Sequence, residues 1–536
     1  MGIPSYFSYI IKNYSNIILN QKQLLKDNVR FCNLMMDCNS IIYDEFRKMD
    51  EDIAKNNLEK NEIERKLINN VINKIGEYIK SASPSDLVYI AFDGVAPFAK
   101  MEQQRTRRHK GGILRKIDNV LGKKCSSSVW STTNITPGTQ FMNMLSVKIK
   151  RAFSNLEGHF NVKKIIVSGS DIEGEGEHKM FQFLRQTKNG VTGNTLIYGL
   201  DSDLIMLSLF HCKPFDKFFI YRETPEFGKN IVSSVEGESD YLFMDIHSLS
   251  KAILCEMNCD TNDYHRLYDY VFMCFLLGND FLPHFPSLNL RSDGVDVLLE
   301  TYKSVFGTSS QRSFIDNNLH IQWRWVSLFF FELSKGERNR FIKEDAAREK
   351  LGKRIFNLSN LDNKEFAIQN TPVIYRGQEL FISPNEQFWE HRYYSTLFSH
   401  SSDSIKDIGT NYIEGLEWVF KYYTQDCPDW KWSYKYNYPP LIKDICKYFP
   451  KKNMDLFQKT IYNPFSSKVQ LAYVLPLNNR TLMSSTISDY LVENEGQYFV
   501  EEPEYEWAYC RYFWEAHPIL PEISINVLEK WDKLWL

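Results

Sequence analysis

The stretches IIVSGSDIEGEGE (165–177) and TLIYGLDSD (195–203) pass from an apolar run straight into closely spaced acids. Three further runs have the same order of apolar residues and then an acid: NLMMD (33–37), LVYIAFD (87–93) and VFMCFLLGND (271–280). Residues 1–310 alternate such strand-like runs with helical patterns, for example LEKNEIERKLINNVINKIGEYIK (58–80), which reads as a crossover helix. This alternation is typical of βαβ units. The sequence therefore predicts an α/β fold with a mostly parallel central sheet flanked by helices.

Seven carboxylates follow these runs: Asp37, Asp93, Glu175, Glu177, Asp201, Asp203 and Asp280. In an open α/β sheet, ligands bind outside the carboxyl ends of parallel strands, so the acids are expected to converge there. Each one alone could instead cap a helix. Together they suit Mg²⁺ or Mn²⁺, which prefer oxygen ligands. Such ions promote phosphodiester hydrolysis, and they would also relieve the repulsion between clustered carboxylates.

A basic segment begins just after Asp93. Nine Lys or Arg and only two acids lie between Ala99 and Lys124, in a chain of net charge -3. Pro97 suits a first helical turn and Gly111–Gly112 suit a stop, so we predict a helix over residues 97–110. At about 100° per residue, one face of this helix carries Lys100, Gln104, Arg107 and Arg108. Beside a metal site, that face suits a terminal 5′ phosphate. The alternatives are a solvated basic helix and a nonspecific backbone-binding strip.

The remaining chain divides into less regular parts. Between Lys110 and Phe141 the pattern loosens into glycines, a basic run and a polar stretch, which indicates a mobile or inserted segment. From Gln322 to Leu536 the chain is rich in aromatic residues and Pro-containing turns. We predict a first domain over residues 1–310, a boundary at 311–340 and a second region over 341–536. No apolar run reaches the ~18 residues of a spanning helix.

Ten longer motifs, which together extend over almost the whole chain, resemble those of one protein family and occur in the same order as in that family. They are MGIPSYFSYI (1–10), MDCNSIIY (36–43), FDGVAPFAKMEQQRTRRHK (92–110), NITPGTQFM (134–142), EGEGEHKMFQFLR (173–185), YGLDSDLIMLSL (198–209), YRETPEFG (221–228), LLGNDFLPHFPSL (276–288), GLEWVFKYYTQDCPDWKWSYKYNYPP (415–440) and NPFSSKVQLAYVLP (463–476). The chain is identified as a member of the XRN family of 5′-to-3′ exoribonucleases, in the flap-endonuclease-like superfamily.

The resemblance implies a PIN-like nuclease core and a second conserved region that completes the substrate channel. The seven acids would hold two Mg²⁺ ions, with Mn²⁺ as a substitute, and the four residues on the basic helix face would accept a 5′ monophosphate. In the family, a His and a Trp stack on the terminal base. Here Tyr43 takes the His position, and Trp430 and Trp432 are the candidates for the Trp. Phe98 stands where the family often has Arg.

The sequence thus predicts a metal-dependent exonuclease that removes nucleoside 5′-monophosphates from single-stranded RNA carrying a 5′ monophosphate. Two alternatives stay open: a structure-specific 5′ flap nuclease acting on DNA, and a noncatalytic RNA-binding scaffold. The chain lacks the zinc-knuckle cysteines and further β-rich domains of larger relatives, so we expect a minimal catalytic core in the cytoplasm. Neither a nucleotide cofactor nor a membrane is expected as a partner. Frequent Asn, Lys and Ile favour an AT-rich genome, as in some microbes and large DNA viruses.

Overall fold

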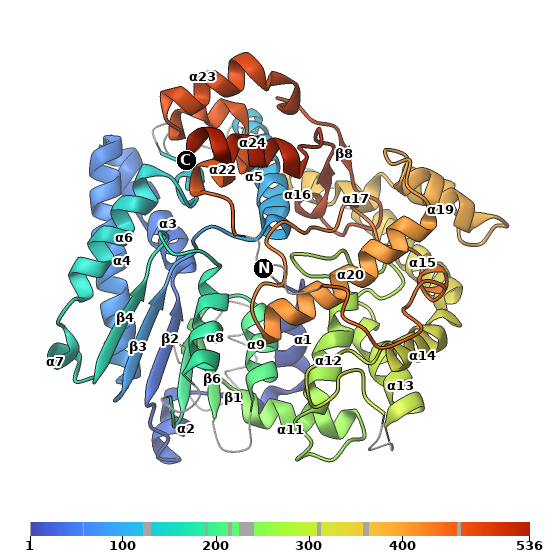
Figure 1. Cartoon of the computed structure of the whole chain (residues 1–536), viewed down its shortest axis with the longest axis horizontal. Coiled ribbons are helices and arrows are strands. Elements are labelled where there is room, and N and C mark those ends of the chain that lie inside the picture. Colours follow the sequence, from blue (N-terminus) through green and yellow to red (C-terminus); the bar gives the residue numbers. More distant parts are fainter. Residues whose placement is uncertain are drawn as a thin grey trace.

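The computed structural model places an α/β half beside a largely helical half (Figure 1). It describes residues 2–56, 58–121, 130–187, 191–212, 217–223, 241–307, 312–356, 364–457 and 463–536. Part of the predicted inserted segment, residues 122–129, and the end of the YRETPEFG motif lie outside the described residues. Within the described part of the chain, no helix combines the length and apolarity needed to cross a membrane.

A seven-stranded sheet organises the α/β half. Its strands are β1 (Ile18–Leu19), β2 (Asn33–Asp37), β3 (Leu87–Ala91), β4 (Lys164–Ser168), β5 (Thr195–Tyr198), β6 (Phe218–Glu223) and β7 (Tyr241–Asp245). They lie in the order β1-β7-β6-β5-β2-β3-β4. The five strands from β6 to β4 are parallel, and β7 and β1 are added antiparallel. The predicted mostly parallel sheet is confirmed.

Both faces of this sheet are covered, because successive side chains of a strand point to opposite faces. Leu34 and Met36 of β2 pack into one hydrophobic cluster, and Met35 between them packs into the other. The first cluster includes α3 (Asn39–Asn56), α4 (Lys60–Ala82) and α6 (Gln140–Phe153). The second includes α1 (Tyr6–Asn13), α8 (Gly176–Gln186), α9 (Asp203–His211), α11 (Ile246–Glu256) and α12 (Arg266–Cys274). Burial on both faces explains the nearly continuous apolar strands.

The second half is mainly helical. Its longer helices are α13 (Gly294–Phe306), α14 (Trp323–Ser334), α15 (Glu337–Phe356), α19 (Trp389–Leu397), α20 (Ile405–Thr424), α22 (Ser467–Val474), α23 (Ser485–Asn494) and α24 (Ile525–Trp535). Short elements join them: α16 (Lys364–Gln369), α17 (Thr371–Ile374), α18 (Gly377–Ile382), α21 (Ile442–Ile445), and the pair β8 (Tyr505–Glu506) and β9 (His517–Pro518). The hydrophobic cluster that covers the second sheet face continues into α14 and α20. One core therefore contains residues from both sides of the predicted 311–340 boundary.

Two local predictions were wrong. The apolar run before Asp280 is not a strand, because residues 266–274 form α12 and residues 275–277 form a 3₁₀ turn. A helix buried all round shows the same unbroken apolar run as a buried strand. The basic helix also does not stop at its glycines: α5 spans Phe98–Val120. An internal Gly costs only about 1 kcal/mol of helix stability, so Gly111 and Gly112 weaken the helix without ending it.

Candidate active site

The sheet brings the predicted acids to one edge. Asp37 ends β2, Asp93 follows β3, and Asp201 follows β5. Glu175 and Glu177 stand at the start of α8, where they reach the same place. Carboxylate oxygens of Asp37, Glu177 and Asp201 lie within 4.8 Å of one another. These five acids line a cavity of about 490 Å³.

The other two predicted acids are buried beside this cavity. Asp203 begins α9 with 2% of its surface exposed. Asp280 follows the 3₁₀ turn after α12, and its Oδ2 lies 2.6 Å from Nζ of Lys100. Lys100 in turn lines the cavity with the other five acids. All seven predicted acids therefore lie in one neighbourhood.

Polar neighbours that the sequence analysis did not single out hold two of these acids in place. Asn39 donates through its amide to Oδ2 of Asp93, and its own Oδ1 accepts from the Asp93 backbone N–H at 3.2 Å. The hydroxyl of Tyr422 donates to Oε1 of Glu175 at 3.0 Å. Asn39 lies two residues after Asp37, inside the quoted MDCNSIIY motif, so local spacing could have indicated it. Tyr422 also lies inside a quoted motif, at 415–440, but it is far from Glu175 in sequence, so spacing could not indicate that the two side chains meet.

Two glycines allow the acids to come this close. A Cβ added to Gly176 would lie 2.7 Å from Oδ1 of Asp37, and the Gly176 backbone N–H donates to Asp93 at 2.7 Å. A Cβ on Gly2, which has a φ of 50°, would lie 2.1 Å from Oδ1 of Asp203. A side chain at either position would displace a carboxylate. The motif glycines thus make room for the cluster.

The cluster is electrostatically costly without cations. Burial and then neighbouring carboxylates raise the pKa of both Asp37 and Glu177 well above the ordinary range, and they raise the pKa of Asp203 to about 7. Oε2 of Glu177 and Oδ1 of Asp203 are buried and have no hydrogen-bond donor among the residues that the structure describes. Buried oxygens without donors, in an all-carboxylate set, match the needs of a hard divalent cation. The residues present therefore fit Mg²⁺ or Mn²⁺.

Lys100 contacts acids rather than standing free on the helix face. Its ammonium bonds to Asp280 at 2.6 Å and also pairs with Glu175. Its side chain is 12% exposed. Burial by itself would raise the pKa of Asp280, but the Lys100 ammonium, together with other nearby cations such as Arg107, lowers that pKa. Lys100 thus acts as an internal counter-ion of the acidic cluster.

The other predicted phosphate ligands line the same cavity, but they differ in exposure and in how many hydrogen bonds they already make within the protein. Gln104 accepts from Nε2 of Gln470 at 3.1 Å. Arg108 is buried and donates to the carbonyls of residues 132 and 135 at 3.2 and 2.9 Å, which ties α5 to that loop. Arg107 is exposed towards the cavity. Because α5 continues past Gly111, Arg115 also lines the cavity, as does Arg47 from α3. Neither of these two was predicted.

Only one of the three predicted stacking residues lines the cavity. Tyr43 lines the cavity, whereas neither Trp430 nor Trp432 is among its lining residues. The indole of Trp432 stacks on Trp418, with ring centroids 5.4 Å apart, and the Trp430 carbonyl accepts from the Phe98 N–H at 2.9 Å. Phe98 itself is buried against Tyr473, so an Arg at that position would lie among apolar side chains here.

A mostly parallel α/β core with an acidic site at its carboxyl edge defines this molecule as a PIN-like domain joined to a helical region. Family comparison agrees. Residues 1–224 match the model described as the XRN 5′-3′ exonuclease N-terminus, and residues 261–379 and 382–503 match the Xrn1 helical domain. The chain therefore belongs to the XRN family.

Several relatives share this similarity over nearly the whole chain. The 5′-3′ exoribonuclease 1 of Saccharomyces cerevisiae is 27% identical over 90% of this chain and 40% of its own length. The 5′-3′ exoribonuclease 2 homolog of Drosophila melanogaster is 25% identical over 99% of this chain and 70% of its own length. The human 5′-3′ exoribonuclease 1 is 26% identical over 98% of this chain and 33% of its own length. The chain thus spans well under half of the yeast and human relatives.

Proposed function

We propose that this protein is a metal-dependent 5′-to-3′ exoribonuclease that releases nucleoside 5′-monophosphates from single-stranded RNA carrying a 5′ monophosphate. One observation carries the proposal: five of the seven acids and the cationic face of α5 line the same cavity. A terminal phosphate held by α5 would set how far the strand extends over the acids. The names of the relatives support the direction of attack and the RNA substrate.

The acids would hold two Mg²⁺ ions, for which Mn²⁺ can substitute. When bound, such ions activate the attacking water and stabilise the leaving 3′ oxygen. Asn39 and Tyr422 keep the carboxylates of Asp93 and Glu175 in fixed orientations, so that little reorganisation accompanies the reaction. Lys100 balances part of the negative charge that remains on Glu175 and Asp280.

Arg107 and Gln104 would bind the 5′ phosphate in this scheme. Arg107 is exposed on the cavity-facing side of α5, and its guanidinium can form paired charge-assisted hydrogen bonds to a phosphate. Tyr43 lies on the same cavity wall and offers a ring face to the terminal base. Arg108 would act by holding the 132–136 loop in place, and it would touch the phosphate only secondarily.

The first experiment compares three RNAs that differ only at the 5′ end. Purified protein is incubated with 5′-monophosphate, 5′-hydroxyl and 5′-triphosphate RNA, with Mg²⁺ or with EDTA, and the products are separated. We expect Mg²⁺-dependent decay of the monophosphate RNA to mononucleotides, and slow decay of the other two. Equal decay of all three would contradict the phosphate pocket. Absence of Mg²⁺-dependent decay would contradict the enzyme.

A variant pair tests the phosphate pocket directly. Arg107→Gln removes a charge-assisted contact of about 1.5–3 kcal/mol, so the preference for 5′-monophosphate over 5′-hydroxyl RNA should fall about tenfold or more. Lys116→Gln is the matched control, because Lys116 lies on the same helix, is exposed and pairs with Glu502 outside the cavity. An equal loss in both variants would indicate general charge attraction instead of a phosphate site.

Two experiments distinguish the proposed exoribonuclease from a flap nuclease and from a noncatalytic scaffold: a substrate competition and a substitution in the acidic site. A DNA flap substrate competed against single-stranded RNA tests the flap-nuclease alternative, and faster cleavage of the flap would favour it. Asp201→Asn should abolish turnover while leaving RNA binding largely intact, and retained turnover would contradict the metal assignment. A noncatalytic scaffold would bind RNA without cutting it. A cytoplasmic role in message decay is inferred from the sequence, and imaging of a tagged chain tests it.

A further inference from the structure

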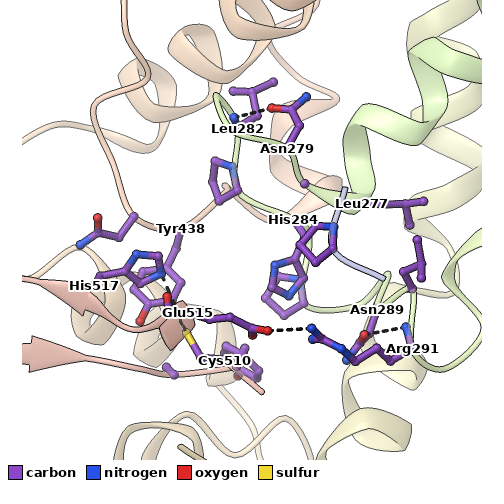
Figure 2. A pocket seen from close by; sticks show the side chains of 18 of the residues that line it. Leu277, Asn279, Leu282, His284, Asn289, Arg291, Tyr438, Cys510, Glu515 and His517 are labelled. Atoms are coloured by element: carbon purple, nitrogen blue, oxygen red, sulfur yellow. Dashed lines mark hydrogen bonds and ion pairs between the residues drawn. The ribbon is translucent and has the colours of Figure 1, made fainter. Parts of the chain in front are cut away.

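A second cavity, of about 210 Å³, lies where the two halves of the chain meet. Figure 2 shows side chains from three separated segments facing its centre, including His284 and Arg291 on one side and Tyr438, Glu515 and His517 on the other. Its lining also includes Lys110 of α5. None of the seven acids and none of the predicted phosphate ligands line it. It is therefore a separate cavity from the one that holds the acids.

This cavity adjoins the acidic cluster from another direction. Asn279 in its wall immediately precedes Asp280, and Pro4 in its wall is two residues from Gly2, which packs against Asp203. Lys110 and Gln104 are on the same helix, but at about 100° per residue they point about 120° apart. Gln104 faces the first cavity and Lys110 the second. Asp280 thus adjoins both cavities, because it pairs with Lys100 in the wall of the first and follows Asn279 in the wall of the second.

Cations line the second cavity. The Arg291 guanidinium pairs with Glu515 at 2.7 Å and lies over the ring of Tyr512. The Lys110 ammonium donates to the Trp514 carbonyl at 2.7 Å, and although burial lowers the pKa of Lys110 to about 8, it is still mainly protonated at neutral pH. Two cations and one carboxylate leave this wall net positive. An anionic group such as a phosphate would be attracted to it.

The remaining lining suits a flat heterocycle. Burial lowers the pKa of His284 to about 4 and that of His517 to about 3, so both imidazoles are neutral and each offers one donor and one acceptor. The Tyr438 ring lies edge-on to His517, with centroids 5.3 Å apart. Neutral rings with hydrogen-bonding edges beside a cation match the base and the phosphate of a nucleotide.

We propose that this second cavity binds a nucleotide of the RNA strand on the 3′ side of the bond that is cut. The inference rests on the proposed function, because it needs a strand whose 5′ phosphate occupies the first cavity and whose backbone crosses the acids. Such a strand then continues past Asp280, where the second cavity begins. Arg291 and Lys110 would contact its phosphate, and His284 and His517 its base.

Equilibrium binding tests this site without depending on turnover. The Asp201→Asn protein is used so that the RNA stays intact. The dissociation constant is measured for a nucleoside 5′-monophosphate, which has no nucleotide on the 3′ side of the bond that is cut, and for a long 5′-phosphorylated RNA. Arg291→Gln and Lys110→Gln are added separately to this protein. Each should reduce the advantage of the long RNA over the mononucleotide about tenfold, because one charge-assisted contact is lost. The slope of log affinity against log salt should also become shallower by about 0.7.

Lys343→Gln is the matched control. Lys343 is an exposed lysine that pairs with Asp293 and does not line the cavity. If the control lowers the advantage of long RNA as much as Arg291→Gln does, the effect is general charge and the proposal is wrong. It is also wrong if neither cavity variant changes that advantage. If the wild-type protein degrades 5′-monophosphate, 5′-hydroxyl and 5′-triphosphate RNA equally fast, the proposed function is refuted instead.

Released nucleotide is the other source of the same chemistry. Nucleoside 5′-monophosphate binding is therefore measured on the same variants. Weaker mononucleotide binding after Arg291→Gln, with binding of long RNA unchanged, would assign the cavity to the product and overturn the proposal. Circular dichroism and the melting temperature of each variant show whether the loss of the Arg291–Glu515 pair has disturbed the fold, and Lys110→Gln tests the same site without breaking that pair.

Discussion

Replacing Lys100 by Met distinguishes a counter-ion of the acidic cluster from a simple phosphate ligand. The Lys100, Glu175 and Asp280 side chains are 12%, 4% and 5% exposed. Removing one partner of a buried ion pair leaves an uncompensated charge and typically costs about 3–5 kcal/mol. We therefore expect Lys100→Met to lower the free energy of unfolding by about that amount in EDTA.

Divalent cations should reverse much of this loss. Bound Mg²⁺ supplies positive charge to the same carboxylates, so the variant should gain more stability from Mg²⁺ than the wild type gains. A tenfold gain in affinity for Mg²⁺ corresponds to about 1.4 kcal/mol. Chemical unfolding of both proteins, in EDTA and in saturating Mg²⁺, measures the difference.

Lys116→Met is the control, since it makes the same change at an exposed pair on the same helix. Lys116→Met should leave the free energy of unfolding nearly unchanged both in EDTA and in saturating Mg²⁺. The reasoning would be refuted if Lys100→Met cost the same stability with and without Mg²⁺. A variant with unaltered unfolding and weakened 5′-phosphate binding would show instead that Lys100 serves the phosphate alone.

Three further changes test the site. Gly176→Ala puts a Cβ 2.7 Å from Oδ1 of Asp37, so turnover should fall about a hundredfold while the fold is kept; Gly112→Ala, which meets nothing within 4 Å, should keep full turnover. Tyr422→Phe removes a buried hydrogen bond to a site carboxylate and should raise the Mg²⁺ concentration for half-maximal rate about tenfold, with an unchanged value arguing against this role. Asp203 has a pKa raised to about 7 from 3.8, so the folded protein binds this proton more tightly than the unfolded chain does. Its stabilising effect is complete below about pH 4 and is lost as the pH rises through 7. In EDTA, the free energy of unfolding should therefore fall as the pH rises from about 4 to 7. Bound Mg²⁺ should make this fall smaller.

Local sequence patterns determined the strand ends that carry three of the acids, the cavity-facing side of α5 and the family of the chain. An apolar run followed by an acid marks the carboxyl end of a buried strand, and this held for Asp37, Asp93 and Asp201 because a strand buried on both faces must be apolar throughout. Helical periodicity placed Lys100 and Arg107 on the cavity side of α5, because 3.6 residues per turn fixes which side chains share a face. The quoted motifs also identified the family over both halves of the chain.

Other features depended on packing between distant segments. The run before Asp280 is a helix, although its composition equally suits a strand, because only the surrounding core decides between two fully buried elements. Lys100 faces Glu175 and Asp280 from separate parts of the chain, and the hydroxyl that holds Glu175 comes from Tyr422 in α20. A sequence pattern records which side chains are buried, and it does not record which partners they meet. Tertiary structure alone brought the counter-ion to the acids and formed the second cavity beside them.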